Sequence, residues 1–134
     1  MTQENKELLL KDLCARLPYH PRVKVWLKDG TTEEGALDLE HNYGDVLIDA
    51  FYYNKIFKIK PYLFPLSSMT DEQEKELKYL CDWENDRWSG LVVIQESKFC
   101  MNTEIIDWLN KNHFDYRGLI DKGLAIDATE LNIY

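Results

Sequence analysis

The residues best suited to acid–base or metal chemistry are three histidines, and they lie far apart. His20, His41 and His113 show no His-Glu-x-x-His or comparable spacing that would hold a metal ion. Glu40 precedes His41, and Asp115 follows His113 by two positions, so either histidine could join an acid–base pair. A real site needs converging geometry, and histidines at the surface or with satisfied hydrogen bonds are commoner. We therefore predict no metal ligands and no catalytic histidine.

Carboxylates and hydroxyls give an equally weak signal for catalysis. Acidic residues recur between Glu33 and Glu40, and paired carboxylates can cleave glycosidic bonds when burial raises the pKa of one. Here they alternate with leucines, as on a solvent-exposed strand face. Ser67-Ser68 lacks the Gly-x-Ser-x-Gly context of a nucleophile, and no glycine-rich phosphate loop occurs. We predict no catalytic residues and no cofactor, with an enzyme of unfamiliar type as the third alternative for the function.

Aromatic residues give the more specific signal. The segment Trp83-Glu-Asn-Asp-Arg-Trp88 sets two tryptophans around a polar connection, and Trp, Tyr and Arg are enriched at binding hot spots. The alternative is that both indoles cover the core, because tryptophan is highly buried on average. Trp26 poses the same choice, since it faces away from Val23 and Val25 and must be covered by a helix or by a partner. The candidate partner-binding residues are Trp88, Arg87, Asp86 and Trp26.

The net charge of −8 limits the classes of partner. The acidic excess lies in residues 71–90 and 104–134, whereas the first 60 residues are close to neutral. A nucleic-acid binder needs clustered Lys and Arg to neutralise phosphates, and no such cluster is visible along the sequence. We expect a solvated acidic surface and a protein partner rather than nucleic acid, and a homo-oligomer stays open.

The cysteines and the first residues bear on the compartment. Cys14, Cys81 and Cys100 form an odd, widely spaced set without a Cys-x-x-Cys motif. Cys14 and Cys81 fall on apolar helix stripes, so we expect buried, reduced thiols, as in a reducing cytosol. The start, MTQENKELLLKDL, has no basic region followed by an apolar stretch of signal length, and no run approaches a membrane span. We expect a cytoplasmic protein with no membrane partner.

The first half of the chain has the pattern of a helix followed by a sheet. A leucine every four residues predicts an amphipathic helix that Pro18 ends. Alternating apolar residues then predict strands, the first two joined by a tight turn at Asp29-Gly30. The predicted ranges are a helix over 3–17, strands over 23–28 and 32–39, a hairpin over 45–52 and 55–60, and an extended segment over 61–66.

The second half is mainly helical. Thr70 and Gln73 form a capping box, which predicts a helix from there through about residue 84. The remaining predicted elements are a short buried strand over 91–94, a helix capped by Asn102 or Thr103, and a short turn that Asp115 caps and Gly123 ends.

Together these elements predict one α+β domain over residues 1–134. Residues 1–66 would form an N-terminal helix and a strongly bent antiparallel sheet or small SH3-like or Sm-like barrel. Residues 67–134 would form a C-terminal helical region with one short strand, packed against that sheet.

Part of this sheet resembles a known signature. Residues 23–37, Val-Lys-Val-Trp-Leu-Lys-Asp-Gly-Thr-Thr-Glu-Glu-Gly-Ala-Leu, resemble the first Sm-like signature, and residues 44–50 are similar to the next segment of that family. The resemblance covers about residues 5–60 and implies a small barrel. The family's base-binding Asn falls near Gly44 or Asp45, and its Arg-Gly pair is missing from 55–60, so RNA binding is not implied. An Sm-like nucleic-acid-associated module is the second alternative for the function.

Three other segments, residues 6–18, 60–70 and 106–120, resemble uncharacterised small proteins of gut-bacterial phages and prophages. This resemblance implies a mobile-element context and brings no activity. Our first expectation is therefore a non-enzymatic protein-interaction module that binds or inhibits a host protein.

Overall fold

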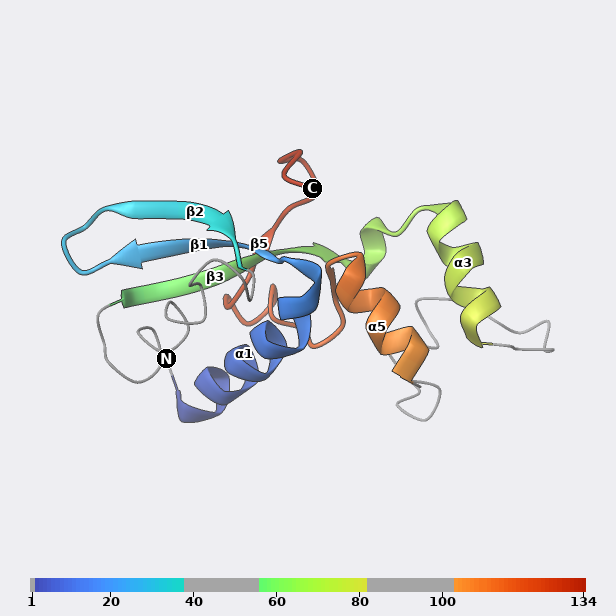
Figure 1. Ribbon diagram of the computed structural model, residues 1–134, viewed down its shortest axis with the longest axis horizontal. Coiled ribbons are helices and arrows are strands. Elements are labelled where there is room, and N and C mark those ends of the chain that lie inside the picture. The colour runs from blue at the N-terminus through green and yellow to red at the C-terminus, as the bar shows by residue number, and fades with distance from the viewer. Residues whose placement is uncertain (1, 38–55, 82–102) are drawn as a thin grey trace.

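The computed structural model describes residues 2–37, 56–81 and 103–134, and it shows an α+β fold. The chain begins with a helix, continues into a sheet and ends in a helical region followed by two short strands (Figure 1). The helices are α1 (Gln3–Arg16), α3 (Asp71–Cys81) and α5 (Thr103–Lys111), with 3-10 turns η1 (Leu17–Tyr19) and η3 (Leu66–Ser68). The strands are β1 (Arg22–Leu27), β2 (Thr32–Ala36), β3 (Ile56–Pro65), β4 (Phe114–Asp115) and β5 (Ile126–Asp127).

Local capping fixes the helix starts, as the sequence predicts. Thr2 Oγ1 accepts a hydrogen bond from the backbone N–H of Asn5 at 3.1 Å, which begins α1. The capping box of α3 is reciprocal: the Gln73 N–H donates to Thr70 Oγ1 at 3.2 Å, and the Thr70 N–H donates to Gln73 Oε1 at 2.9 Å. The helix expected over residues 3–17 and the start of the second helix are therefore confirmed.

The described strands form one open, mixed sheet in the order β2-β1-β3-β4, with β5 also paired to β3. β1 is antiparallel to β2 and β3, whereas β4 and β5 run parallel to β3. The expectation of a purely antiparallel sheet is wrong, because the chain leaves β3, passes through the helical region and returns in the same direction. The strand expected over 45–52 lies outside the described residues, so barrel closure is not shown.

β3 is the element that joins the two parts of the molecule. It continues to Pro65, so the segment expected to be merely extended over 61–66 belongs to the sheet. Phe64 N–H donates to His113 O, and Leu63 O accepts from Ala128 N–H, each at 2.8–2.9 Å. The Leu63 carbonyl and the Phe64 N–H belong to the same trans peptide and therefore point in opposite directions. β4 and β5 thus pair with opposite edges of β3. The predicted C-terminal half thus contributes two strands to the sheet among the described residues, and the strand expected over 91–94 is not described.

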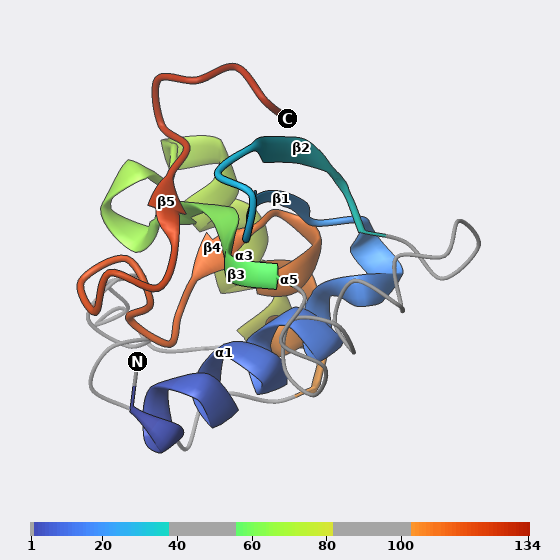
Figure 2. The same ribbon diagram turned by 90° about the vertical axis from the view of Figure 1, so that its left-hand side faces the viewer.

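Two buried hydrophobic clusters lie along β3, one toward each end of the strand. The first lies between α1 and the inner face of the sheet, where α1 runs beneath β1 and β3 (Figure 2). Its members are Leu9, Leu13, Val23, Val25, Leu37, Ile59, Leu63, Leu119, Leu124 and Ala125. The second joins α3 and α5 at the other end of β3 and contains Leu66, Leu77, Ile105, Leu109 and Phe114. Leu77 of α3 is fully buried in this second cluster.

The buried face of α1 differs from the predicted one. Leu9, Asp12, Leu13 and Arg16 are buried, at the i, i+3, i+4 and i+7 positions of one face. Cys14, expected in the core, is exposed. The side chains of Cys81 and Cys100 lie outside the description. The face turns toward Asp12 because this carboxylate has two arginine partners inside the molecule.

Candidate functional site

The outer face of the sheet gathers basic side chains around one tryptophan. Val23 and Val25 are buried on the inner face, so the alternate residues Arg22, Lys24 and Trp26 point outward. The register of β1 and β3 adds two more lysines to this outer side. We call the set Arg22, Lys24, Trp26, Lys58 and Lys60 the basic sheet face.

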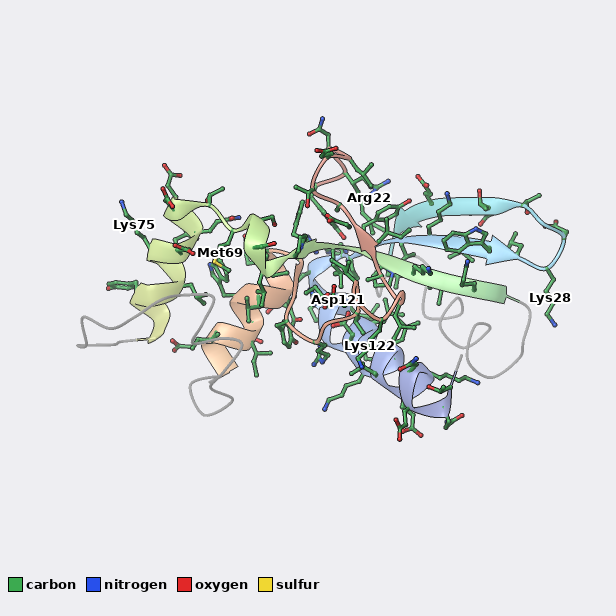
Figure 3. All side chains as sticks on the ribbon, turned by 180° about the vertical axis from the view of Figure 1, so that it is seen from behind. Arg22, Lys28, Met69, Lys75, Asp121 and Lys122 are labelled. Atoms are coloured by element: carbon green, nitrogen blue, oxygen red, sulfur yellow. The ribbon has the colours of Figure 1, made fainter. Side chains whose placement is uncertain are left out.

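Strand pairing decides which of these residues meet. Lys24 lies directly opposite Lys60, and Trp26 lies directly opposite Lys58. The register shifts between Trp26 and Leu27, where β3 contributes one extra residue, and such a bulge re-aims the side chains beside it. Figure 3 shows the hairpin from behind, with Arg22 at the start of β1 and Lys28 at the turn.

Trp26 is half-buried, and two ammonium groups lie near its ring. Lys58 Nζ lies 4.2 Å and Lys24 Nζ lies 5.4 Å from the centroid of its ring. Each cation–π contact of this kind contributes about 0.5–1 kcal/mol at an exposed site. Both cation–π contacts of this ring come from lysines of β1 and β3, the strand of Trp26 and its neighbour.

The charge on this face is unbalanced. Glu34 is the carboxylate of β2 on the same side, 3.7 Å from Lys24 Nζ. It also accepts a hydrogen bond of 2.7 Å from the Tyr62 hydroxyl. Burial, followed by the effect of Glu34, raises the pKa of Tyr62 to about 12, so this hydroxyl remains a donor. In the described sheet, one carboxylate thus faces four cations.

The expectation that basic residues do not cluster is wrong for this face. Arg22 and Lys24 lie in β1, and Lys58 and Lys60 lie in β3, more than 30 positions later. Antiparallel pairing brings them together, and a scan along the sequence does not detect such a cluster. Of the candidate partner-binding residues, the structure places Trp26 here. Trp88, Arg87 and Asp86 lie outside the described residues and remain predictions.

A buried ionic cluster ties α1 to the C-terminal region. Asp12 Oδ2 accepts from Arg16 Nε, and Asp12 Oδ1 accepts from Arg117 Nη1, both at 2.8 Å. Arg16 also donates from Nη2 to the Phe114 carbonyl at 2.6 Å, and both guanidinium groups lie over the Tyr116 ring. Sequence reasoning missed this cluster, because Asp12 and Arg117 are separated by 105 positions. We read these contacts as structural, since both Asp12 oxygens, Arg16 Nε and Nη2, and Arg117 Nη1 bond within the fold.

His113 does not form the acid–base pair that its sequence allows with Asp115. The Asp115 carboxylate instead accepts from the N–H groups of Leu119 and Ile120, both at 2.9 Å, which confirms its predicted capping role. The imidazole stacks on the Tyr134 ring, with 3.6 Å between centroids. Burial, with a contribution from Arg16, lowers the pKa of His113 to about 4, so this histidine is neutral at pH 7.

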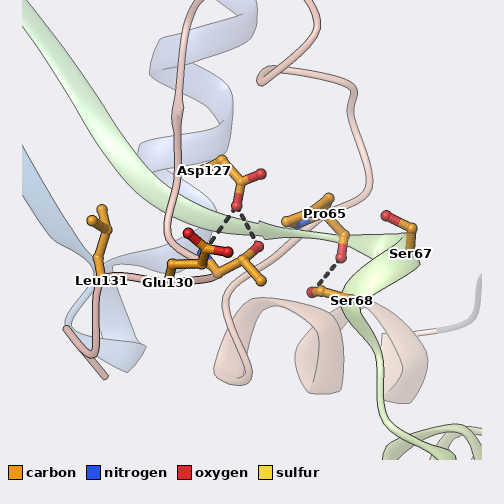
Figure 4. A pocket seen from close by; sticks show the side chains of 7 residues that line it. Pro65, Ser67, Ser68, Asp127, Glu130 and Leu131 are labelled. Atoms are coloured by element: carbon orange, nitrogen blue, oxygen red, sulfur yellow. Dashed lines mark hydrogen bonds between the residues drawn. The ribbon is translucent and has the colours of Figure 1, made fainter.

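Two hollows formed by described residues are large enough for a small molecule. One has a volume of about 570 Å³ and is lined by Pro65, Ser67, Ser68, Asp127, Thr129, Glu130 and Leu131 (Figure 4). Three of its polar side chains take part in local hydrogen bonds: Ser68 Oγ donates to Pro65 O at 2.7 Å, and Thr129 donates to the Asp127 carboxylate. The lining holds no histidine or lysine that could act as a base for either serine.

The second hollow lies between α3 and α5 and has a volume of about 690 Å³. Tyr79, at 86% exposure, and Trp108 line it together with Lys75, Glu76, Lys111 and Asn112. Trp108 Nε1 donates to Glu76 Oε2 at 3.2 Å, and its ring stacks on Phe114. The tryptophan is therefore anchored to the fold at both its polar and its apolar part.

Within residues 2–37, 56–81 and 103–134, no three His, Cys, Asp or Glu side chains converge as a metal site would require. No helix in those ranges is long and apolar enough to cross a bilayer. Comparison with known protein families, with curated proteins and with solved structures found no match. Function must therefore be inferred from the geometry of the basic sheet face.

Proposed function

We propose that this chain is a non-enzymatic binding module whose basic sheet face takes a partner with clustered negative charge. The observation that carries the proposal is the arrangement around Trp26: two ammonium groups border the ring, and a third lysine, Lys60, lies directly opposite Lys24. Like charges directly opposite one another destabilise a sheet. A negatively charged partner would relieve this repulsion on binding.

The contrast with the rest of the chain supports a specific surface. The net charge is −8, so a partner with negative charge is repelled by the chain as a whole and attracted by this face. Such an asymmetry orients the approach of a charged partner and favours one binding geometry. The large aromatic ring adds the kind of residue that dominates binding energy at interfaces.

Several expectations from the sequence belong to this proposal. A host protein of a mobile element remains a candidate partner, with Trp88, Arg87 and Asp86 as further contacts. We also propose that the sheet closes into an SH3-like or Sm-like barrel and that the protein is cytoplasmic. The third alternative, an enzyme, gains no support from the described hollows.

Retention on immobilised heparin, a polyanion, tests the proposal. We expect the native protein to bind at low salt and to elute as salt rises, although its net charge is negative. The double variant Lys58→Glu/Lys60→Glu should flow through. The matched control Lys75→Glu/Lys122→Glu carries the same change in net charge at two exposed positions outside the face, and should still bind. If both double variants were retained equally, the proposal would be refuted. It would also be refuted if the native protein were not retained at all.

A further inference from the structure

We propose that the ligand of the basic sheet face is single-stranded nucleic acid, with one base stacked on Trp26 and the adjoining phosphates held by the lysines. This inference rests on the proposed function, since it names the partner of the same face. It predicts binding to both DNA and RNA strands without strong sequence preference.

The position of Trp26 supports base stacking. Single-stranded nucleic acids bind flat protein surfaces by stacking bases on aromatic rings while basic residues follow the backbone. Among the described residues, the Trp26 ring has the ammonium groups of Lys24 and Lys58 over it, and its side chain is partly exposed. Lys58 Nζ, 4.2 Å from the ring centroid, occupies the place of a stacked base and can leave it by rotation of its own side chain. The ammonium group thus released is next to the base and can pair with its phosphate.

The lysine spacing suits a chain of phosphates rather than a single anion. Outward-facing residues on one strand lie about 7 Å apart, and neighbouring strands lie about 5 Å apart. Lys24, Lys58 and Lys60 occupy both strands around the ring, and Arg22 extends the row at the start of β1. One compact anion would contact only part of this row, whereas a flexible polyanion can contact all of it.

The shape of the face disfavours a duplex. Reading the grooves of double-stranded DNA requires a protruding helix or ribbon, and the basic sheet face is the surface of a sheet. The bases of a duplex are stacked on one another, so they offer no free face to Trp26. An acidic protein could match the charges, yet it would leave the tryptophan ring without a planar partner. The combination of ring and cations therefore favours an unpaired strand.

Fluorescence anisotropy with labelled oligothymidylate of about 12 nucleotides tests the inference, because a strand of that length spans a typical site. We expect a dissociation constant of about 1–100 µM at physiological salt and tighter binding at low salt. The logarithm of the binding constant should fall with log salt with a slope of about −2 to −3 for four cations. Lys58→Gln/Lys60→Gln should reduce that slope by about 1.4. The same sequence in a duplex should bind at least about tenfold more weakly.

Two substitutions of Trp26 separate stacking from electrostatics. Trp26→Leu keeps an apolar side chain without a π-face and should weaken oligothymidylate binding about tenfold or more. Trp26→Phe retains a ring and should keep most of the affinity. Thermal unfolding of each variant confirms that the fold is retained, and any variant that unfolds early is compared at a temperature where it is native.

The outcomes distinguish this inference from the proposed function. Binding to heparin or polyglutamate without binding to oligothymidylate would overturn the nucleic-acid inference and leave the anion-binding module standing. Equal affinity of Trp26→Leu and the native protein for oligothymidylate would also overturn it, because the face would then act by charge alone. Failure to bind any polyanion would overturn both. Strand binding that depends on Trp26 and on the lysines supports both.

Discussion

At the level of single residues, two buried nitrogen atoms among the described residues lack hydrogen-bond partners, one in Arg16 of the ionic cluster and one in the nearby His113. Within the described part of the chain, Arg16 Nη1 and His113 Nδ1 have no hydrogen-bond partner. A buried polar atom without a partner costs free energy, and the fold tolerates it here because Asp12, Phe114 O and the Tyr116 ring engage the rest of Arg16. His113 remains neutral beside this cation, and its protonation would add a second positive charge there.

Stability should therefore fall as the pH drops through the range in which His113 titrates. The folded-state pKa is about 4 and the unfolded-state value is 6.5, so the unfolded chain binds more protons between these pH values. Allowing for partial exposure, we expect this residue to remove about 1–2 kcal/mol between pH 6.5 and pH 4. Urea unfolding of the native protein and of His113→Asn across this pH range measures this loss of stability. Asn is chosen because it tolerates the positive φ of 62° at this position.

The exposed His20 provides the control. It also has a positive φ, 53°, so His20→Asn makes the same replacement in a similar backbone conformation. Parallel pH profiles for the native protein and His113→Asn would show that His113 does not titrate in this way.

At the scale of elements, strand pairing determines what the sequence could and could not predict. The caps that start α1 and α3 and the Asp29-Gly30 turn depend on neighbours within a few positions, and the structure confirms them. The cap expected at Asn102 or Thr103 falls at the edge of the described residues and is not tested. Gly30 adopts a φ of 91°, which glycine reaches without strain. The basic sheet face depends instead on the register of β1 with β3, which local patterns do not determine. The same limit explains Asp12, whose burial depends on a residue 105 positions away.

The pairing of Lys24 with Lys60 leads to a test at this scale. Lys60→Glu replaces a like-charge pair by an opposite-charge pair, so we expect it to stabilise the fold by about 0.2–1 kcal/mol. The same change should weaken retention on heparin, because it removes one cation of the basic sheet face. Thermal unfolding and heparin elution, measured on one preparation, check both effects. Lower stability together with weaker retention would indicate that Lys60 has a structural role instead.

At the scale of the whole molecule, contacts distant in sequence connect the N-terminal helix to the C-terminal region. Asp12 on α1 binds Arg117 beyond β4, and the same carboxylate holds Arg16 against the Phe114 carbonyl. Tyr134 makes a second connection, since its hydroxyl accepts from the Arg22 N–H at 2.7 Å and donates to the Tyr62 carbonyl at 2.9 Å. Its pKa is raised to about 12, chiefly by burial, so it remains protonated and able to donate.

Removal of the Asp12 carboxylate should have a large effect, because two arginines lose their counter-ion inside the fold. We expect Asp12→Ala to lower the free energy of unfolding by about 3–5 kcal/mol, as for other broken buried ion pairs. For a chain of this length the midpoint of thermal unfolding should fall by about 10 °C or more. Glu7→Ala, on the exposed side of the same helix, should change stability by less than about 0.5 kcal/mol. Similar effects of the two changes would contradict the assigned role of Asp12.

The Tyr134 hydroxyl can be tested without disturbing its ring. Tyr134→Phe keeps the stacking on His113 and removes both hydrogen bonds, so we expect a loss of about 1 kcal/mol in denaturant unfolding. Tyr79→Phe, at a side chain that is 86% exposed, serves as the control and should be neutral. No difference between the two would mean that water replaces the hydroxyl fully.

The position of Tyr134 also has a consequence for the order in which the protein forms during its synthesis. Arg22 and Tyr134 are 112 positions apart, and ribosomes add about 5–20 residues per second. The hydrogen bond between the Arg22 N–H and the Tyr134 hydroxyl can therefore form only about 6–22 s after Arg22 has been added to the chain. The hairpin around Trp26 needs only β1 and β2, which are synthesised earlier. The hairpin residues proposed to contact nucleic acid, Trp26 among them, are thus exposed to the ribosome's surroundings before the Arg22–Tyr134 hydrogen bond can form.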